Sequence, residues 1–412
     1  MRPEASPIAN NVSPGTSTVT PVTQNHQDHV LEYMPLASAP RTHIAFLDGI
    51  RGLSALYVVL YHCVIRGELG VIGHRLTGWM EYGRFAVDVF IVLSGYCLML
   101  PVARSTDRQL RGGIRQYIKR RARRILPPYY GSMIVAIVFV SAGRYMKHGQ
   151  ASVGMADPTA LSPGNLLTHI LLMHNLFRAY VTSLNPVLWT VALEWQLYFV
   201  FPILLLPLWR RTGFVSTVFL ACLLGISPLV LAPNYNLGWT CPWFVGLFAM
   251  GMAAAVVTES RKERFQSIVL RIPWGWLSLL CVAVPLVFRL PDSITWWLND
   301  LIVGGAAAML ILHCVRCLRG PSSRPADLLV RLFQSRPAVG LGMFSYSLYL
   351  IHDPFNWILR SFLRSLHLSH RGQFFFSLFI DVPLVIALSY GFYLLCERPF
   401  VASKSASVQN GM

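Results

Sequence analysis

The stretch RGLSALYVVLYH, residues 51 to 62, begins with an arginine and ends with a histidine around a largely apolar run. Such a run is typical of a membrane span, and an ionisable side chain inside a span usually faces the protein interior or a water-filled cavity. Arg51 and His62 are eleven residues apart, close to three helical turns, so they share one helix face about 16 Å apart. Asp48 precedes Arg51 by one turn and can pair with it. The stretch predicts a membrane helix with a cationic end and a deeper imidazole on the same face.

The whole chain has the composition of a polytopic membrane protein. Of its 412 residues, 54% are hydrophobic and only 13% are charged, and the mean hydropathy is +0.50. Soluble domains contain about 25% charged residues. We therefore predict an all-α membrane protein with about ten transmembrane helices, because ten apolar runs approach the length of about 20 residues that a span needs. These runs are 46–66, 84–101, 128–145, 187–209, 214–232, 238–258, 272–290, 296–318, 340–361 and 373–396.

The net charge of +17 lies mainly between the apolar runs, with no aromatic-basic module for nucleic acid. We therefore interpret the basic residues as loop charge that sets the orientation of the chain in the membrane, and not as a nucleic-acid-binding surface. Loops on the side of both termini carry more than twice as many Lys and Arg as the others, which predicts cytoplasmic termini. We expect a disordered cytoplasmic tail at 1–44, a transmembrane domain at 45–400 and a short cytoplasmic tail at 401–412. The sequon at Asn11 would then stay unglycosylated. A short apolar segment at 165–177 is predicted to be re-entrant or interfacial.

Ionisable residues recur at similar depth in four of the predicted spans. Besides His62, they are Asp88, Glu194 and the adjacent pair His352 and Asp353. If these helices are neighbours, the side chains line one polar chamber. Each also has a simpler explanation: a packing hydrogen bond for a histidine, a local pair with Arg84 for Asp88, or a helix kink at Pro354. Glu194 shows no neighbour in sequence to pair with.

A strongly basic segment, RGGIRQYIKRRARRILPPYY, spans residues 111 to 130. It is predicted to anchor the chain on anionic lipid, to bind phosphate groups through Arg120, Arg121 and Arg124, or to do both. The eight cysteines lie mostly in apolar runs and are interpreted as small core residues. Cys314 and Cys317 form a single CxxC, which is weak support for a metal site, so no metal is expected.

Five stretches together resemble the acyltransferase 3 family of multipass membrane acyltransferases. They follow the family's order and cover essentially residues 43 to 400, with the Arg-x10-His pattern as the most specific mark. The stretches are FLDGIRGLSALYVVLYH (46–62), GRFAVDVFIVLSGY (83–96), RRARRILPPYY (120–130), LWTVALEWQLYFVFP (188–202) and FSYSLYLIHDPF (344–355).

The resemblance implies about ten transmembrane helices and transfer of an acyl group, often acetyl, from acyl-CoA to a hydroxyl of a sugar, polymer or small natural product. It implies that Arg51 and His62 are essential and that Glu194 and the arginines around Arg124 are functional. No hydrolase-like domain follows the last apolar run, so we expect no relay to such a domain within this chain. The Ser/Thr/Pro-rich tail favours a eukaryotic, for example fungal, source, and for a eukaryotic protein we expect an endomembrane location. A natural-product acceptor would imply a role in secondary metabolism.

A mechanism follows from combining the resemblance with the residue pattern. Acetyl-CoA is expected to dock its phosphates on Arg51, Arg120, Arg121 and Arg124, and His62 to act as the base, because imidazole titrates near neutral pH. Glu194 or Asp88 would orient His62, and His352, Asp353 and Trp189 would line the acceptor chamber. A route through acyl-His62 stays open. The alternative function is a proton-coupled transporter or flippase that uses the same groups as a relay; a receptor or scaffold fits least well.

Overall fold

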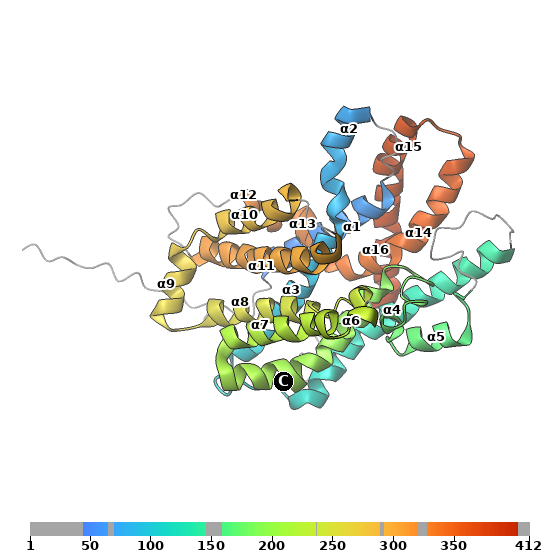
Figure 1. Cartoon of the computed structure of the whole chain (residues 1–412). Coiled ribbons are helices and arrows are strands. Elements are labelled where there is room, and N and C mark those ends of the chain that lie inside the picture. Colours follow the sequence, from blue (N-terminus) through green and yellow to red (C-terminus); the bar gives the residue numbers. More distant parts are fainter. Residues whose placement is uncertain are drawn as a thin grey trace, which may run out of the picture. The chain divides into compact units, whose positions relative to one another are not determined.

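The computed structural model describes residues 44–64, 70–145, 159–235, 237–288, 292–319 and 328–402. Across these ranges the chain is helical and contains no strand, in agreement with the predicted all-α class (Figure 1). The α-helices are α1 (Ala45–Cys63), α2 (Gly70–Thr77), α3 (Gly83–Arg104), α4 (Gly113–Tyr145), α5 (Pro163–Ile170), α6 (Leu188–Val200), α7 (Leu206–Leu231), α8 (Phe244–Glu259), α9 (Glu263–Arg271), α10 (Trp274–Val287), α11 (Asp292–Arg319), α12 (Leu328–Phe333), α13 (Arg336–Met343), α14 (Ser345–Ser365), α15 (His370–Phe376), α16 (Val382–Phe392) and α17 (Arg398–Ala402).

Six helical segments of the described ranges are long and apolar enough to cross a membrane. A seventh would be the pair α9 and α10, which are bent by 64° at their junction. The six segments are Arg75–Arg104, Gly113–Ala142, Leu188–Leu231, Leu237–Glu259, Trp296–Arg319 and His370–Val401. These segments identify an integral membrane protein.

The predicted count of about ten spans is not confirmed. The predicted runs 46–66 and 340–361 do form helices, α1 and α14, but neither is among the six. Both carry several polar and ionisable side chains, which lower their hydropathy. The runs 187–209 and 214–232 share the segment Leu188–Leu231, which is interrupted at Gly213 by a non-helical backbone with φ of 82°. The tails predicted at 1–44 and 401–412, with the Asn11 sequon, lie almost entirely outside the described residues.

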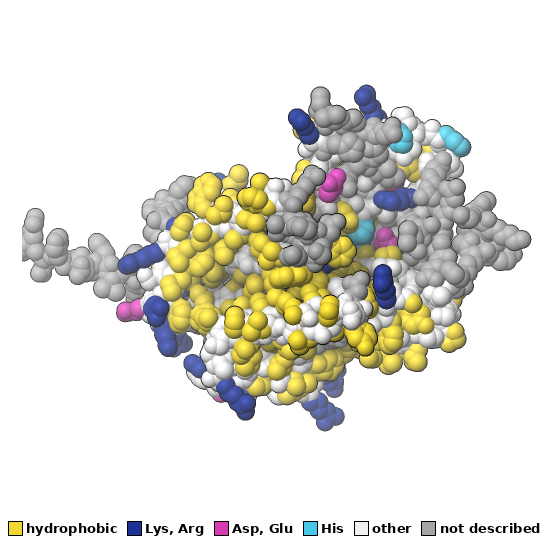
Figure 2. All heavy atoms as spheres, viewed as in Figure 1, with side chains coloured by type: hydrophobic (Ala, Val, Ile, Leu, Met, Phe, Trp, Pro, Cys, Tyr) yellow, Lys and Arg dark blue, Asp and Glu magenta, His cyan; other side chains and the backbone are white. Residues whose placement is uncertain are grey.

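The outer surface is apolar where a membrane would contact it. Helices α7 and α10 expose large hydrophobic side chains, including Phe219 and Leu223 on α7 and Trp276 and Leu280 on α10. Figure 2 shows hydrophobic side chains covering this part of the surface, with Lys and Arg gathered at its margins. A water-soluble protein rarely exposes an apolar area of this extent.

The core of the described chain is organised around α3 and α8. These two helices form the most extensive pairing, and α3 also packs against α1 and α11 (Figure 1). The approach of α3 and α8 depends on two glycines: a Cβ atom at Gly95 would lie 2.1 Å from the carbonyl oxygen of Phe248, and one at Gly251 would lie 2.0 Å from that of Val92. Small residues allow such close contact between membrane helices.

Replacing Gly251 by alanine should therefore destabilise the protein by about 1–3 kcal/mol, because the added methyl group forces α3 and α8 apart. Thermal unfolding in detergent measures the effect. Gly305 on α11 is the matched control, since a Cβ atom there has nothing within 4 Å. Equal melting temperatures for Gly251→Ala and Gly305→Ala would contradict the close packing.

Candidate functional site

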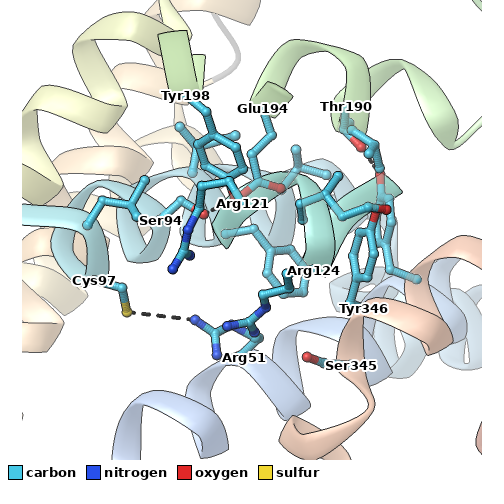
Figure 3. A pocket seen from close by; sticks show the side chains of 17 residues that line it. Arg51, Ser94, Cys97, Arg121, Arg124, Thr190, Glu194, Tyr198, Ser345 and Tyr346 are labelled. Carbon is cyan, nitrogen blue, oxygen red and sulfur yellow. Dashed lines mark hydrogen bonds between the residues drawn. The ribbon is translucent and has the colours of Figure 1, made fainter. Parts of the chain in front are cut away.

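A cavity lies between α1, α3, α4, α6 and α14 and has a volume of about 90 Å³, enough for several water molecules. Three arginines line it: Arg51 from α1, and Arg121 and Arg124 from α4. Figure 3 shows their guanidinium groups pointing into one space, with Glu194 of α6 on the other side. Positive side chains outnumber negative ones in this lining, so the cavity suits an anionic ligand.

Arg51 is held by two neighbours inside the protein. Its Nη1 donates to Oδ1 of Asp48 at 3.1 Å, which is the local pair expected from the spacing of these residues. Its Nη2 points to Sγ of Cys97 at 3.7 Å (Figure 3). The carboxylate neutralises part of the charge of Arg51 and fixes its direction, while the other arginines remain available to a ligand.

Glu194 has two hydroxyl donors on the same oxygen. Oε1 accepts from the hydroxyl of Ser94 and, at 2.6 Å, from that of Tyr198. Tyr198 lies four residues after Glu194, on the same face of α6, so the carboxylate does have a neighbour in sequence to pair with. The i, i+4 spacing was the signal that would have revealed it. Ser94 comes from α3 and is far away in sequence.

His62 lies at the C-terminal end of α1, against α14. Its ring centroid is 5.1 Å from that of His352 and 4.8 Å from that of Tyr61. Its main-chain oxygen accepts from Nδ2 of Asn356 at 3.1 Å and from Nη2 of Arg360. His352, Asn356 and Arg360 follow one another at intervals of four, so one face of α14 holds both the ring and the backbone of His62.

The groups predicted to share one polar chamber are divided between separate places. The cavity that Glu194 lines does not include His62, Asp88, His352 or Asp353. His352 is buried beside His62, and the next residue, Asp353, is half-buried. Similar depth along a helix does not fix the direction of a side chain around it, so helices that are neighbours can still direct these groups to different sites.

Asp88 and Trp189 belong to a third region. Arg84 pairs not with Asp88 but with Asp300 of α11, at 2.7 Å, and lies over the ring of Trp189 at 5.8 Å. Asp88 is fully buried, and neither of its oxygens has a hydrogen-bond partner among the described residues. Among the residues that the structure describes, neither Asp88 nor Glu194 forms a hydrogen bond to the ring of His62. Asp300 was missed from the sequence, although a carboxylate inside the predicted run 296–318 is the same signal that selected Asp88 and Glu194.

Arg120 faces a second pocket of about 320 Å³ at the surface of α4, with Lys119 and Arg123. Arg121 and Arg124 line this pocket as well as the inner cavity. The two spaces are therefore adjacent, and the predicted basic segment forms the boundary between them.

The segment predicted to be re-entrant or interfacial contains α5 and a short turn, His174–Leu176. His169 and His174 stack there with ring centroids 3.8 Å apart, and both are fully buried. Burial lowers the pKa of His169 to about 4. Burial, together with the neighbouring His169, lowers the pKa of His174 to about 2. Both rings are thus neutral at pH 7. Across the described residues, no group of three or more His, Cys, Asp or Glu could hold a metal ion.

Comparison with known proteins agrees with the resemblance carried by the sequence motifs. The chain is 22% identical over 332 residues to the O-acetyltransferase OatA of Staphylococcus aureus, covering 77% of this chain and 51% of that protein. It is 24% identical over 339 residues to the peptidoglycan O-acetyltransferase OatA of Listeria monocytogenes, covering 76% and 49%. A putative O-acetyltransferase of S. aureus is 23% identical over 392 residues, covering 87% and 57%.

The chain thus spans about half the length of the curated relatives that it matches. No solved structure gives a significant match. The family model described as an acyltransferase domain matches residues 44–396, which include α1, the arginines of α4, Glu194 and the His62–His352 pair. The chain belongs to the acyltransferase 3 family.

Proposed function

We propose that this protein is a membrane O-acetyltransferase that moves an acetyl group from acetyl-CoA to a hydroxyl of a carbohydrate or small natural product. The observation that carries the proposal is the convergence of Arg51, Arg121 and Arg124 on one cavity next to a basic surface pocket. Acetyl-CoA fits this arrangement, because its phosphates match the basic surface pocket and its thin acylated arm matches the narrow cavity. We place this pocket and both termini on the cytoplasmic side, following the bias of loop charge.

The surface pocket is suited to the phosphates of the donor. Arginine binds phosphate through parallel N–H donors, which makes it more selective than lysine for this group. Arg120 and Arg123 lie in the pocket, whereas Arg121 and Arg124 border both spaces. The phosphates would bind in the surface pocket and at its border with the cavity, against Arg121 and Arg124, and the uncharged arm would continue from there into the cavity.

From the cavity, a series of aromatic rings leads towards His62. Tyr349 lines the cavity, and its ring centroid lies 5.8 Å from that of His352, which in turn is 5.1 Å from His62. The hydroxyl of Tyr349 is 2.7 Å from that of Thr190. Tyr349 therefore stands between the donor cavity and the histidine pair, and the acetyl group must pass it to react. The separation of about 16 Å between Arg51 and His62 along α1 is of the order that an extended pantetheine arm spans.

The transfer needs one base and one acid. His62 takes the proton of the acceptor hydroxyl while the oxygen of that hydroxyl forms a bond to the carbonyl carbon of the thioester. The carbon–sulfur bond then breaks, and the proton on His62 neutralises the departing CoA thiolate. No other co-reactant is required. Glu194 is held by Ser94 and Tyr198 at the donor end, so we assign it to the cavity and not to His62.

A carbohydrate acceptor is supported by the relative named as a peptidoglycan O-acetyltransferase. A direct test incubates membranes containing the full chain with radiolabelled acetyl-CoA and a chitooligosaccharide or a mixture of hydroxylated natural products. Acetylated product that appears only with acetyl-CoA supports the proposal. Movement of the acceptor across sealed vesicles without covalent change, dependent on a proton gradient, would instead indicate the transporter.

Replacing Arg124 by glutamine should raise the KM for acetyl-CoA about 10- to 100-fold, because a hydrogen bond to a charged group contributes about 1.5–3 kcal/mol. The dependence of KM on salt concentration should also become weaker. Steady-state kinetics at several ionic strengths measure both effects. Arg210 is the control, because it is exposed and donates to the carbonyl oxygen of Arg108; an equal effect of Arg210→Gln would argue against a specific donor site.

A further inference from the structure

We infer that His352 is a positioning residue for His62: its Nε2 accepts the ring N–H of His62 and so leaves the other nitrogen of His62 free to act as the base. The inference rests on the proposed function, in which His62 removes the proton of the acceptor hydroxyl.

The tautomer of His352 follows from its hydrogen bonds. Nδ1 lies 2.7 Å from the carbonyl oxygen of Tyr349 and 3.2 Å from that of Leu348. A carbonyl oxygen only accepts, so Nδ1 must carry the hydrogen. In a neutral imidazole Nε2 is then a bare acceptor.

This acceptor is buried without a partner. His352 is fully buried, and its Nε2 has no hydrogen bond among the described residues. Leaving such a group unsatisfied in the interior is unfavourable, because it has lost its hydrogen bonds to water. A buried polar atom that retains this cost in the unliganded protein is suited to bind a group that moves towards it during the reaction.

The group placed to do so is the ring of His62, whose centroid is 5.1 Å away and tilted by 54°. The backbone of His62 is fixed to the same helix by Asn356 and Arg360, so only rotation of the ring is needed to bring an N–H to Nε2. Catalytic hydrogen bonds are often long in the unliganded protein and shorten when substrate binds.

The consequence for the chemistry is specific. An imidazole that donates one N–H to a fixed acceptor presents its second nitrogen as a lone pair, which is the form that a general base needs. When His62 gains the hydroxyl proton, Nε2 of His352 also stabilises the resulting imidazolium. The proton leaves on the CoA thiol, so His352 begins and ends each cycle with the hydrogen on Nδ1.

Two substitutions separate this role from a structural one. In His352→Asn the amide occupies the place of Nδ1 and can still donate to the carbonyl of Tyr349, but nothing occupies the place of Nε2. In His352→Gln the amide oxygen reaches the place of Nε2, and the bond to the helix backbone is lost. We expect kcat to fall about 10- to 100-fold in His352→Asn, as for other residues that orient a reacting group, and to be largely retained in His352→Gln. The KM for acetyl-CoA should not change in either, because neither variant touches the arginines.

A readout independent of turnover accompanies the kinetics. In protein labelled with ¹⁵N-histidine and saturated with acetyl-CoA, the ring signals of His62, identified by their loss in His62→Ala, should shift towards the other tautomer in His352→Asn but not in His367→Asn. His367 is an exposed histidine in the loop after α14 and serves as the control. If the wild type transfers acetyl and His62→Ala does not, but His352→Gln is as impaired as His352→Asn, the inference fails and the proposed function stands. If the wild type transfers nothing, the proposed function fails, and an unchanged His62 signal in His352→Asn then overturns the inference separately.

Discussion

Replacing His62 by alanine should reduce acetyl transfer about 10²- to 10⁴-fold, the usual contribution of a general base. Binding of acetyl-CoA should persist, because Arg51, Arg121 and Arg124 line a cavity that does not include His62. Transfer of radiolabel to the acceptor measures the first quantity, and equilibrium binding of labelled acetyl-CoA to the purified protein measures the second.

The matched control is His367→Ala, which removes an exposed imidazole outside the site. A His62→Ala protein that still transfers acetyl at nearly the wild-type rate would make His62 a packing residue, and the base would have to be sought at His352 or Glu194. Loss of donor binding together with transfer would instead indicate that α1 had lost its position.

Replacing Asp300 by asparagine should destabilise the protein by about 3 kcal/mol. Asp300 is 1% exposed and accepts from Arg84 at 2.7 Å and from Nε1 of Trp243 at 2.8 Å. Removing one partner of a buried ion pair costs about 3–5 kcal/mol, because the other charge is left without compensation. We expect the lower end, since Arg84 is 31% exposed and its guanidinium also lies over aromatic rings, among them that of Trp296 at 5.4 Å.

Thermal unfolding in detergent tests this, with Arg104→Gln as the control. Arg104 pairs with Glu259 but is 35% exposed, and such pairs contribute about 0–1 kcal/mol. A loss in Asp300→Asn no larger than that in Arg104→Gln would show that the link between α3 and α11 does not depend on this charge pair.

The parts of the structure that depend on local sequence were predictable. Hydropathy located the helices that became α3, α8 and α11, and spacing along α1 placed Asp48 beside Arg51. The basic segment of α4 was expected to anchor the chain on anionic lipid, to bind phosphates, or both; Arg121 and Arg124 line a cavity, and the role of the segment stays a prediction. Each of these features is decided within a few turns of one helix.

The contacts between helices were not predictable from one sequence. Asp300 binds Arg84, which is 216 residues away in sequence, and Asn356 binds His62, which is 294 residues away. Which face of a membrane helix meets which neighbour depends on packing of small residues such as Gly95 and Gly251, which hydropathy does not report. For this reason the predicted chamber combined groups that lie in different places.

The anchoring of α1 has a consequence for how this site can vary. Asn356 and Arg360 bind the main-chain oxygen of residue 62, an atom that every amino acid possesses. These two hydrogen bonds to the end of α1 do not depend on the side chain at position 62. The imidazole can therefore be replaced while both bonds are kept. A substitution at position 62 can thus remove the reactive group without removing the contacts that hold α1 against α14, so an inactive variant can still be correctly folded.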